Sequence, residues 1–203
     1  MADALKAVFL DVGETLVNED RYWREVAAAA GLEPHVVTAA LGVTIARGEE
    51  HTALWSHLGV ERPKVVGEIS YTEADLYPDA IPCLDALRAL GLRVGLAGNQ
   101  SEVLERWTRE TLEVSVIGSS ASWGVRKPDP AFFARMRAEA RCAPDELAYV
   151  GDRVDNDVVP ALAAGFVAVH LRRGPWGRLQ QAPREALVVD SLAQLTDALA
   201  SRA

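Results

Sequence analysis

The stretch Ala7-Val8-Phe9-Leu10-Asp11-Val12-Gly13-Glu14-Thr15-Leu16-Val17 runs from apolar residues into a carboxylate, then a glycine turn and a threonine. A short apolar run bounded by turn residues is typical of a fully buried strand. Ligands in open α/β sheets bind outside the carboxyl ends of the strands, which is where Asp11 is expected to lie. An Asp at such a position is also common as a turn residue. The function of Asp11 therefore depends on what the rest of the chain provides.

From residue 77 onward, the hydrophobic pattern predicts strands that alternate with helices. Strands are expected at residues 92–97, 114–117, 147–150, 166–171 and 187–189, and helices at 79–90, 101–111, 130–140, 156–164 and 192–200. Such alternation produces βαβ units, so the chain is expected to form a parallel sheet with right-handed crossovers. The glycine-rich stretch at residues 174–177 is expected to be a loop.

Between the first strand and this alternating part, the chain shows only helical patterns. They cover residues 21–30, 34–46, 49–58 and 63–69. We therefore predict an α/β fold, with a Rossmann-like doubly wound parallel sheet core formed by residues 1–16 and 78–203. Residues 17–77 are expected to form a small inserted all-helical cap.

Composition excludes several classes of function. The 203 residues are 49% hydrophobic and 25% charged, as in an ordinary globular protein, and carry a net charge of −8 without a Lys/Arg block. This argues against a nucleic-acid partner and against an anionic membrane surface. Residues 158–171 form the longest strongly apolar stretch without charge, too short to span a bilayer, and the first six residues do not resemble a signal peptide. The two cysteines are too few for a disulfide framework, so a reduced cytoplasmic location is expected.

Four of the predicted strand ends carry polar motifs. They are the stretch at 11–15, Gly98-Asn99-Gln100-Ser101, Arg126-Lys127-Pro128-Asp129-Pro130, and Gly151-Asp152-Arg153-Val154-Asp155-Asn156-Asp157. Each motif alone is common at turns and helix starts. Their combination, with each motif at or just beyond a strand's carboxyl end, indicates a catalytic site.

In these motifs the chain resembles the haloacid dehalogenase superfamily of hydrolases, in the subfamily with a helical cap after the first motif. The resemblance includes the stretch at 77–92 and the fourth motif at 149–157. It implies that Asp11 is the nucleophile, which forms an aspartyl-phosphate, and that Lys127 binds the phosphoryl group. It also implies a Mg²⁺ ion held by the Asp11 carboxylate, the Gly13 carbonyl and Asp152, with Asp157 acting directly or through water.

These implied roles agree with the chemistry. A carboxylate attacks a phosphate dianion only if the negative charge between them is neutralised, and a metal with a lysine supplies that charge. Carboxylate and carbonyl oxygens suit Mg²⁺. The chain has only three lysines (Lys6, Lys64 and Lys127), so the one in the third motif is unlikely to be there by chance.

Two positions depart from the family pattern. Phosphatases of the family have a second Asp two residues after the nucleophile, where it protonates the leaving group, but this chain has Gly13. General acid catalysis typically raises the rate by about 10²–10⁴-fold. Glu14 is the nearest other carboxyl group, but its side chain is expected to point to another face. The second departure is Gly98, where a Ser or Thr usually bonds the phosphoryl oxygen; the Asn99 side chain and backbone N–H groups are the expected substitutes.

Three functions remain compatible with this pattern. The favoured one is a Mg²⁺-dependent phosphatase for a small phosphorylated molecule, either slow or restricted to good leaving groups, acting as a monomer or homodimer. The second is an inactive or weakly active binding protein with the same fold. The third is carbon–halogen hydrolysis on Asp11, which needs neither general acid nor metal.

The segment expected to be the cap gives few clues to the substrate. Trp23, Arg47, His51, Trp55 and His57 are the candidates to face the site. Core packing of the tryptophans and surface positions for the others are the favoured interpretation. The sequence shows no zinc-ligand spacing and no nucleotide-binding loop.

Overall fold

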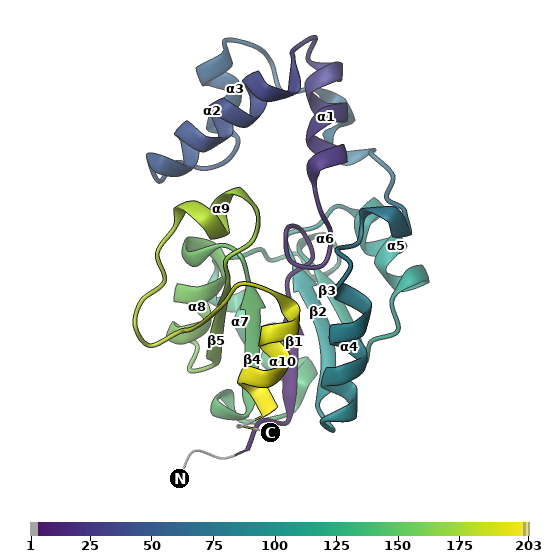
Figure 1. The fold of residues 1–203 in the computed structure, drawn as a ribbon, viewed down its shortest axis with the longest axis vertical. Helices are drawn as coiled ribbons and strands as arrows, with labels where there is room; N and C mark the ends of the chain where they lie inside the picture. The colour runs from purple at the N-terminus through teal and green to yellow at the C-terminus, as the bar shows by residue number, and fades with distance from the viewer. Residues whose placement is uncertain (1–3, 201, 203) are drawn as a thin grey trace.

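The computed structural model describes residues 4–200 and 202, which form a parallel sheet flanked by helices, with further helices above it (Figure 1). In chain order the elements are β1 (Ala7–Leu10), α1 (Asp20–Ala29), α2 (Pro34–Ala46), α3 (Ala53–Leu58), η1 (Lys64–Gly67), η2 (Glu73–Asp75), α4 (Ala80–Ala89), β2 (Arg93–Gly98), α5 (Glu102–Thr111), β3 (Val116–Ser119), α6 (Ser120–Trp123), α7 (Pro130–Ala140), η3 (Pro144–Glu146), β4 (Leu147–Gly151), η4 (Val154–Val158), α8 (Val159–Ala163), β5 (Val167–Leu171), α9 (Gly174–Leu179), β6 (Leu187–Val189) and α10 (Leu192–Ala200).

The six strands follow the order β3-β2-β1-β4-β5-β6, and each recorded strand pairing is parallel. Strand β1 therefore lies in the middle of the sheet, between β2 and β4. The order reverses between β1 and β4, and at such a switch point the loops diverge and leave a crevice at the carboxyl ends. The predicted doubly wound parallel sheet is thus confirmed, and its crevice lies where the first and fourth motifs begin.

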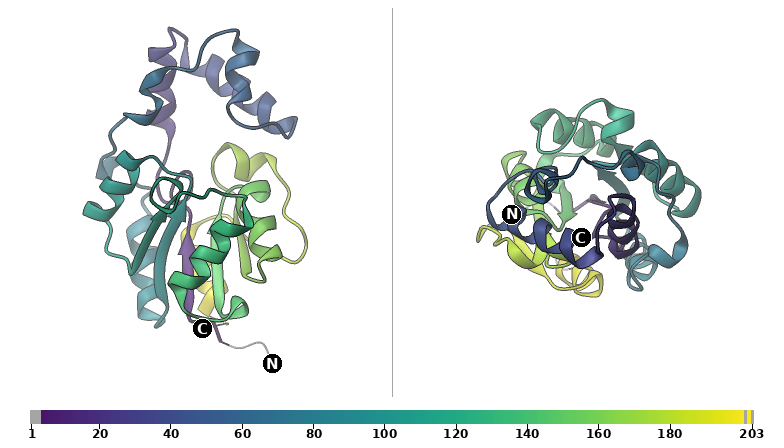
Figure 2. Two further views of the ribbon diagram at one scale, coloured as in Figure 1. Left: turned by 180° about the vertical axis from the view of Figure 1, so that it is seen from behind. Right: turned by 90° about the horizontal axis from the view of Figure 1, so that it is seen from above.

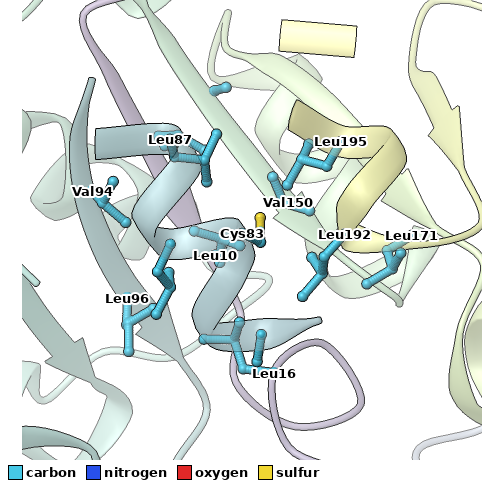
Figure 3. Close-up of a cluster of buried hydrophobic side chains, with 14 of the residues drawn as sticks. Leu10, Leu16, Cys83, Leu87, Val94, Leu96, Val150, Leu171, Leu192 and Leu195 are labelled. Atoms are coloured by element: carbon cyan, nitrogen blue, oxygen red, sulfur yellow. The ribbon is translucent and has the colours of Figure 1, made fainter. Parts of the chain in front are cut away.

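The sheet is covered on both faces because side chains alternate along each strand. Val8 and Leu10 of β1 join a buried cluster with helices α4 and α10, while Ala7 and Phe9 join another with α7 and α8. Figure 3 shows the first cluster, in which Leu87 of α4 and leucines of α10 lie over the sheet. Both views in Figure 2 agree with this three-layer arrangement.

Helices α1, α2 and α3 lie beyond the carboxyl ends of the strands and pack around a buried cluster of their own (Figure 1). Val26, Leu41 and Leu54 are central to this cluster and are almost fully buried. Trp176 of α9 also belongs to it, so a helix that follows β5 contacts the helical segment.

Two chain segments connect this helical part to the sheet, and they lie side by side. Val17 and Leu76 form an antiparallel bridge, and the Asn18 N–H donates to the Asp75 carbonyl at 2.7 Å. The boundaries that we predict for the cap, residues 17 and 77, fall at this crossing. The division into core and cap stays a prediction.

Most predicted elements lie within two residues of their expected bounds, but four differ. The helix expected at 49–58 begins only at Ala53, and residues 63–69 form only the short 3-10 helix η1. The helix expected at 156–164 is split into the π-helical turn η4 and α8. The loop expected at 174–177 is wrong: these residues begin helix α9. Pro175 lies in the first turn, where a proline is compatible with a helix, and burial of Trp176 stabilises it.

No single helix among the described residues is long and apolar enough to cross a membrane; only α1 and α2 taken together, bent by 109°, pass a test of length and composition. Both cysteines are free: Cys83 lies on the buried face of α4, and Cys142 is half-buried.

Candidate active site

Three carboxylates meet at the switch point of the sheet. Asp11 follows β1, Asp152 follows β4, and Asp157 lies in η4. All three are buried, and they offer oxygen atoms that lie within 4.8 Å of one another. Residues far apart in the sequence meet here because β1 and β4 are adjacent and parallel. Such a cluster is unfavourable unless cations balance its charge.

One cation in this cluster is Lys127, which is 1% exposed. Its Nζ lies 2.9 Å from Asp11 Oδ1 and 2.6 Å from Asp157 Oδ1. It also donates to the Tyr149 hydroxyl at 2.9 Å, and that hydroxyl donates to the Ala97 carbonyl at 2.7 Å. Burial alone would lower the pKa of Lys127, but the two aspartates outweigh it and raise the pKa, so the ammonium stays charged.

The backbone of Lys127 is fixed by Asn99. The Asn99 side chain donates from Nδ2 to the Lys127 carbonyl at 2.9 Å and accepts from its N–H at 2.8 Å. We expected the Asn99 amide to contact the phosphoryl group, whereas here both ends of the amide hold Lys127. A second amide hydrogen remains, so contact with the phosphoryl group stays a prediction.

The carboxylates of Asp157 and Asp152 differ in their partners. Asp157 uses both oxygens, since Oδ1 accepts from Lys127 and Oδ2 accepts from the Arg153 N–H at 3.0 Å. Burial raises the pKa of Asp157 to about 6 even though Lys127 opposes the shift. In Asp152 the Oδ2 atom is buried and has no hydrogen-bond partner within residues 4–200 and 202. Burial first, and then the charges of Asp157 and Asp11, raise the pKa of Asp152 well above its ordinary value.

An unpartnered buried carboxylate oxygen beside two other carboxylates fits a hard divalent cation such as Mg²⁺. Asp11 and Asp152 are the residues best placed to hold it. Asp157 is already bonded through both oxygens, so its contribution is to orient Lys127 or to act through water. Gly13, whose carbonyl we expected as a ligand, lies in the wall of the same pocket.

The two glycines that depart from the family pattern face occupied space. A Cβ atom on Gly98, at the end of β2, would lie 2.3 Å from Asp11 Oδ1. A Cβ atom on Gly13 would lie 2.5 Å from Glu19 Oε1. A carboxyl group from another residue therefore lies where a side chain at position 13 would extend.

Glu19 is half-buried and directly precedes α1. Burial, and then the charges of Glu14 and Asp11, raise the pKa of Glu19 to about 8. The neighbouring Glu14 has φ +51°, and its carboxylate accepts hydrogen bonds from the Tyr77 hydroxyl at 2.6 Å and the Glu19 N–H at 3.2 Å. Glu14 is thereby committed to the loop, whereas the Glu19 side chain borders the site.

A pocket of about 570 Å³ lies over these groups, between the sheet and the helical segment. Its wall includes Asp11, Gly13, Glu14, Glu19, Tyr22, Trp23, Glu50, His51, Arg62, Asn99, Gln100, Arg126, Lys127, Asp152, Arg153 and Trp176. Burial first, and then the positive charge of Arg153, lower the pKa of His51, and Arg62 and Arg126 add to this effect. Three arginines therefore line the pocket that holds the acidic cluster.

Two of the five cap candidates, Trp23 and His51, line this pocket. Trp55 instead packs in the cluster of α1–α3, and His57 pairs with Glu49. Since α3 begins at Ala53, His51 lies before the helix and does not share a helix face with Trp55.

Several site residues were not identified from the sequence. Gln100 is 6% exposed, lines the pocket, and has neither its side-chain oxygen nor its nitrogen in a hydrogen bond. Glu19 was missed because an acidic residue at the start of a helix is common, since its negative charge interacts favourably with the helix dipole. In the sequence, Tyr149 is one more residue of the buried strand β4. Its hydroxyl was nevertheless an indication of a role in the site, because a buried hydroxyl requires a hydrogen-bond partner.

Comparison with known proteins agrees with the fold and the motifs. Residues 5–165 match the family of haloacid dehalogenase-like hydrolases. The chain is 31% identical to the glyceraldehyde 3-phosphate phosphatase of Methanopyrus kandleri, over 85% of this chain and 86% of that protein. It is 30% identical to the phosphoglycolate phosphatase of Rhodospirillum rubrum, over 97% of this chain and 83% of that protein.

Solved structures show the same fold at lower identity. A dehalogenase superposes with a TM-score of 0.72 at 19% identity, covering 98% of this chain and 99% of that one. A phosphatase from Thermococcus onnurineus superposes with a TM-score of 0.63 at 20% identity, covering 96% and 98%. With its sheet order, its four motifs and these matches, the chain belongs to the haloacid dehalogenase-like hydrolases.

Proposed function

We propose that this enzyme is a Mg²⁺-dependent phosphatase that acts on a small phosphorylated molecule through an aspartyl-phosphate on Asp11. The observation that carries the proposal is the position of Lys127, whose ammonium contacts Asp11 next to an unpartnered oxygen of Asp152. Relatives named as phosphatases over most of the chain support the same reaction. A cytoplasmic location and a monomeric or homodimeric state stay predictions.

In the proposed reaction, an Asp11 oxygen attacks phosphorus and the bond to the leaving group breaks. Lys127 neutralises charge between the nucleophile and the phosphoryl group, and Asp157 and Asn99 hold the lysine in place. Asp11, Asp152 and the Gly13 carbonyl would hold Mg²⁺, which when bound supplies further positive charge to the phosphoryl oxygens. Water then releases phosphate from Asp11.

The phosphoryl group also needs neutral hydrogen-bond donors. Gly98 offers no hydroxyl, but the buried Gln100 amide lies beside it, since a Cβ atom on Gly98 would be 3.0 Å from Gln100 Nε2. Because this amide has no hydrogen-bond partner among the residues that the structure describes, we infer that Gln100 bonds the phosphoryl group where the family pattern has a Ser or Thr.

The pocket indicates the kind of substrate. Its volume of about 570 Å³ suits a small metabolite, and Arg62, Arg126 and Arg153 in its wall favour an anion. The net charge of −8 does not favour anions globally, so this local cationic wall is needed. Glyceraldehyde 3-phosphate and 2-phosphoglycolate, the substrates of the named relatives, are the first compounds to test.

The test is phosphate release from these compounds, p-nitrophenyl phosphate and acetyl phosphate, with millimolar Mg²⁺ or with EDTA. We expect turnover that requires Mg²⁺ and is abolished in Asp11→Asn. Asp197→Asn, on an exposed face of α10, is the matched control and should behave as the parent. Absence of turnover with all four substrates contradicts the proposal. Halide release from a 2-haloacid in the presence of EDTA would support carbon–halogen hydrolysis instead.

A further inference from the structure

The reaction on Asp11 leaves one proton unaccounted for. When the leaving group is an alkoxide, it must be protonated as the bond to phosphorus breaks, because a free alkoxide is a poor leaving group in water. Gly13 has no side chain to donate that proton. On sequence alone, we therefore expect an enzyme that is either slow or restricted to leaving groups that need no proton.

The structure places a carboxyl group at the missing position. Glu19 Oε1 lies 2.5 Å from the point where a Cβ atom of residue 13 would be, and its Cδ lies 3.2 Å from that point. The oxygen distance is close to the reach of an aspartate oxygen from its own Cβ, although the carboxyl carbon of Glu19 approaches from farther away than an aspartate carboxyl carbon would lie. Glu19 lines the same pocket as Asp11 and Lys127, so its carboxyl group faces the space in which a substrate of Asp11 would bind.

The other carboxyl groups in the pocket wall are less suitable donors. Glu14 accepts hydrogen bonds from Tyr77 and from the Glu19 backbone. Asp152 belongs to the proposed metal site, and the Glu50 side chain is 71% exposed. Among the residues that the structure describes in this wall, Glu19 therefore remains as the candidate.

We propose that Glu19 protonates the leaving group in place of the aspartate that Gly13 replaces, and hence that the substrates are alkyl phosphates. This inference rests on the proposed phosphatase function. As Asp11 oxygen bonds to phosphorus, the electron pair of the breaking phosphorus–oxygen bond stays on the leaving oxygen, which takes the Glu19 proton. The Glu19 carboxylate then removes a proton from the water that attacks phosphorus, and the Asp11–phosphorus bond breaks. Phosphate leaves, and both carboxyl groups return to their first state.

The experiment compares an alkyl phosphate, glycerol 3-phosphate, with p-nitrophenyl phosphate, whose leaving group needs no proton. In Glu19→Gln we expect kcat/KM to fall by about 10²-fold or more for the alkyl phosphate and by less than about tenfold for the aryl phosphate. Glu25→Gln, on the exposed face of helix α1, which follows Glu19, is the matched control and should leave both values unchanged. Retained aryl turnover also shows that the variant is folded.

A second variant moves the carboxyl group back to position 13. Because the two side chains would occupy the same space, Gly13→Asp is combined with Glu19→Ala. We expect Glu19→Ala alone to lose turnover of the alkyl phosphate. The double variant should have a kcat/KM for this substrate at least about tenfold higher than that of Glu19→Ala. Recovery without Glu19 would exclude a purely structural role for that residue.

Three other outcomes of these measurements would contradict the role of Glu19 as proton donor. Equal losses for both substrates, or no loss, would show that Glu19 does not act on the leaving group. Equal losses that excess Mg²⁺ reverses would assign Glu19 to the metal instead. A parent enzyme that hydrolyses neither ester would overturn the proposed function itself, and the inference with it.

Discussion

Gly98 leaves room for the nucleophile. A Cβ atom on this residue would lie 2.3 Å from Asp11 Oδ1, and Asp11 is held by Lys127 at 2.9 Å. The serine or threonine found here in relatives would therefore push the Asp11 carboxylate from its present position. Gly98 and Gln100 are two parts of one arrangement, in which the amide replaces the hydroxyl.

We predict that Gly98→Ser, which restores the usual family residue, lowers kcat by about 10²-fold, because a nucleophile displaced by about 1 Å loses its alignment. The measurement is p-nitrophenyl phosphate turnover, with the unfolding midpoint as a check of the fold. Gly42→Ala is the control, since a Cβ atom on Gly42 contacts nothing within 4 Å. Equal or higher turnover in Gly98→Ser would contradict the prediction.

The charged site residues that follow strands could be predicted from the sequence, whereas Glu19, which approaches the site through a turn, could not. Asp11, Lys127 and Asp152 come after apolar strands, and the parallel sheet brings such positions together by topology. Glu19 comes close to Gly13 through a reversal of the loop, which depends on Glu14 at φ +51° and its bond to the Glu19 N–H. No hydrophobic period encodes that reversal.

At the scale of elements, Asp75 links helix α1 to the segment that leads from the helical part back to the sheet. Its carboxylate accepts from Arg21 at 2.8 and 2.7 Å and from the Thr72 N–H at 2.7 Å, and it is 6% exposed. Hydrogen bonds from Arg21 first, with those from Thr72, outweigh burial and lower the pKa of Asp75. This clamp lies beside the Val17–Leu76 bridge.

We predict that Asp75→Asn lowers the free energy of unfolding by about 1.5–3 kcal/mol at pH 7, because charge-assisted bonds to a buried carboxylate are lost. A carboxyl whose pKa is lowered by folding stabilises the fold above its unfolded pKa, and the effect disappears as the pH falls through the folded pKa. The difference between parent and variant should therefore be constant above about pH 5 and shrink below pH 4.

The measurement is urea denaturation of both proteins at pH 7, 5 and 3.5. Asp85→Asn breaks an exposed ion pair with Arg88 and should cost less than about 1 kcal/mol at every pH. A difference that grew on acidification would contradict the assigned sign.

The bounds of α7 and α2 agree with the predicted ones to the residue, because each helix begins at a proline, Pro130 or Pro34, that is compatible with a first turn. Helix α9 was predicted as a loop, because glycines and a proline indicate a loop when only the local sequence is considered. Its stability comes from a tertiary contact: Trp176 is buried among the helices of the inserted segment, and the Arg153 guanidinium lies 4.7 Å from its ring.

At the scale of the whole molecule, the acidic cluster links metal binding to folding. Only the folded chain brings the three carboxylates within 4.8 Å, so a cation bound there stabilises the fold. We predict that saturating Mg²⁺, at about 100 times its dissociation constant, adds about 2.7 kcal/mol and raises Tm by roughly 5–10 °C. Thermal melts with Mg²⁺ or with NaCl of equal ionic strength measure this shift.

Asp152→Asn should abolish the shift and raise Tm without Mg²⁺, because it removes an unpartnered buried carboxylate. Asp197→Asn should keep the full shift. A shift of the same size in Asp152→Asn would place the cation elsewhere.

The helical segment is joined to the sheet at the Val17–Leu76 bridge. If the segment rotated about this bridge, the displacement of each part of the pocket would depend on its distance from the bridge. Glu19 lies two residues beyond Val17, next to this bridge, whereas helices α2 and α3 lie farther from it (Figure 1). A rotation about this bridge would therefore shift Glu19 less than it shifts α2 and α3. If Glu19 acts as we propose, its carboxyl group would stay beside Gly13 while the part of the pocket wall carried by the helical segment moves.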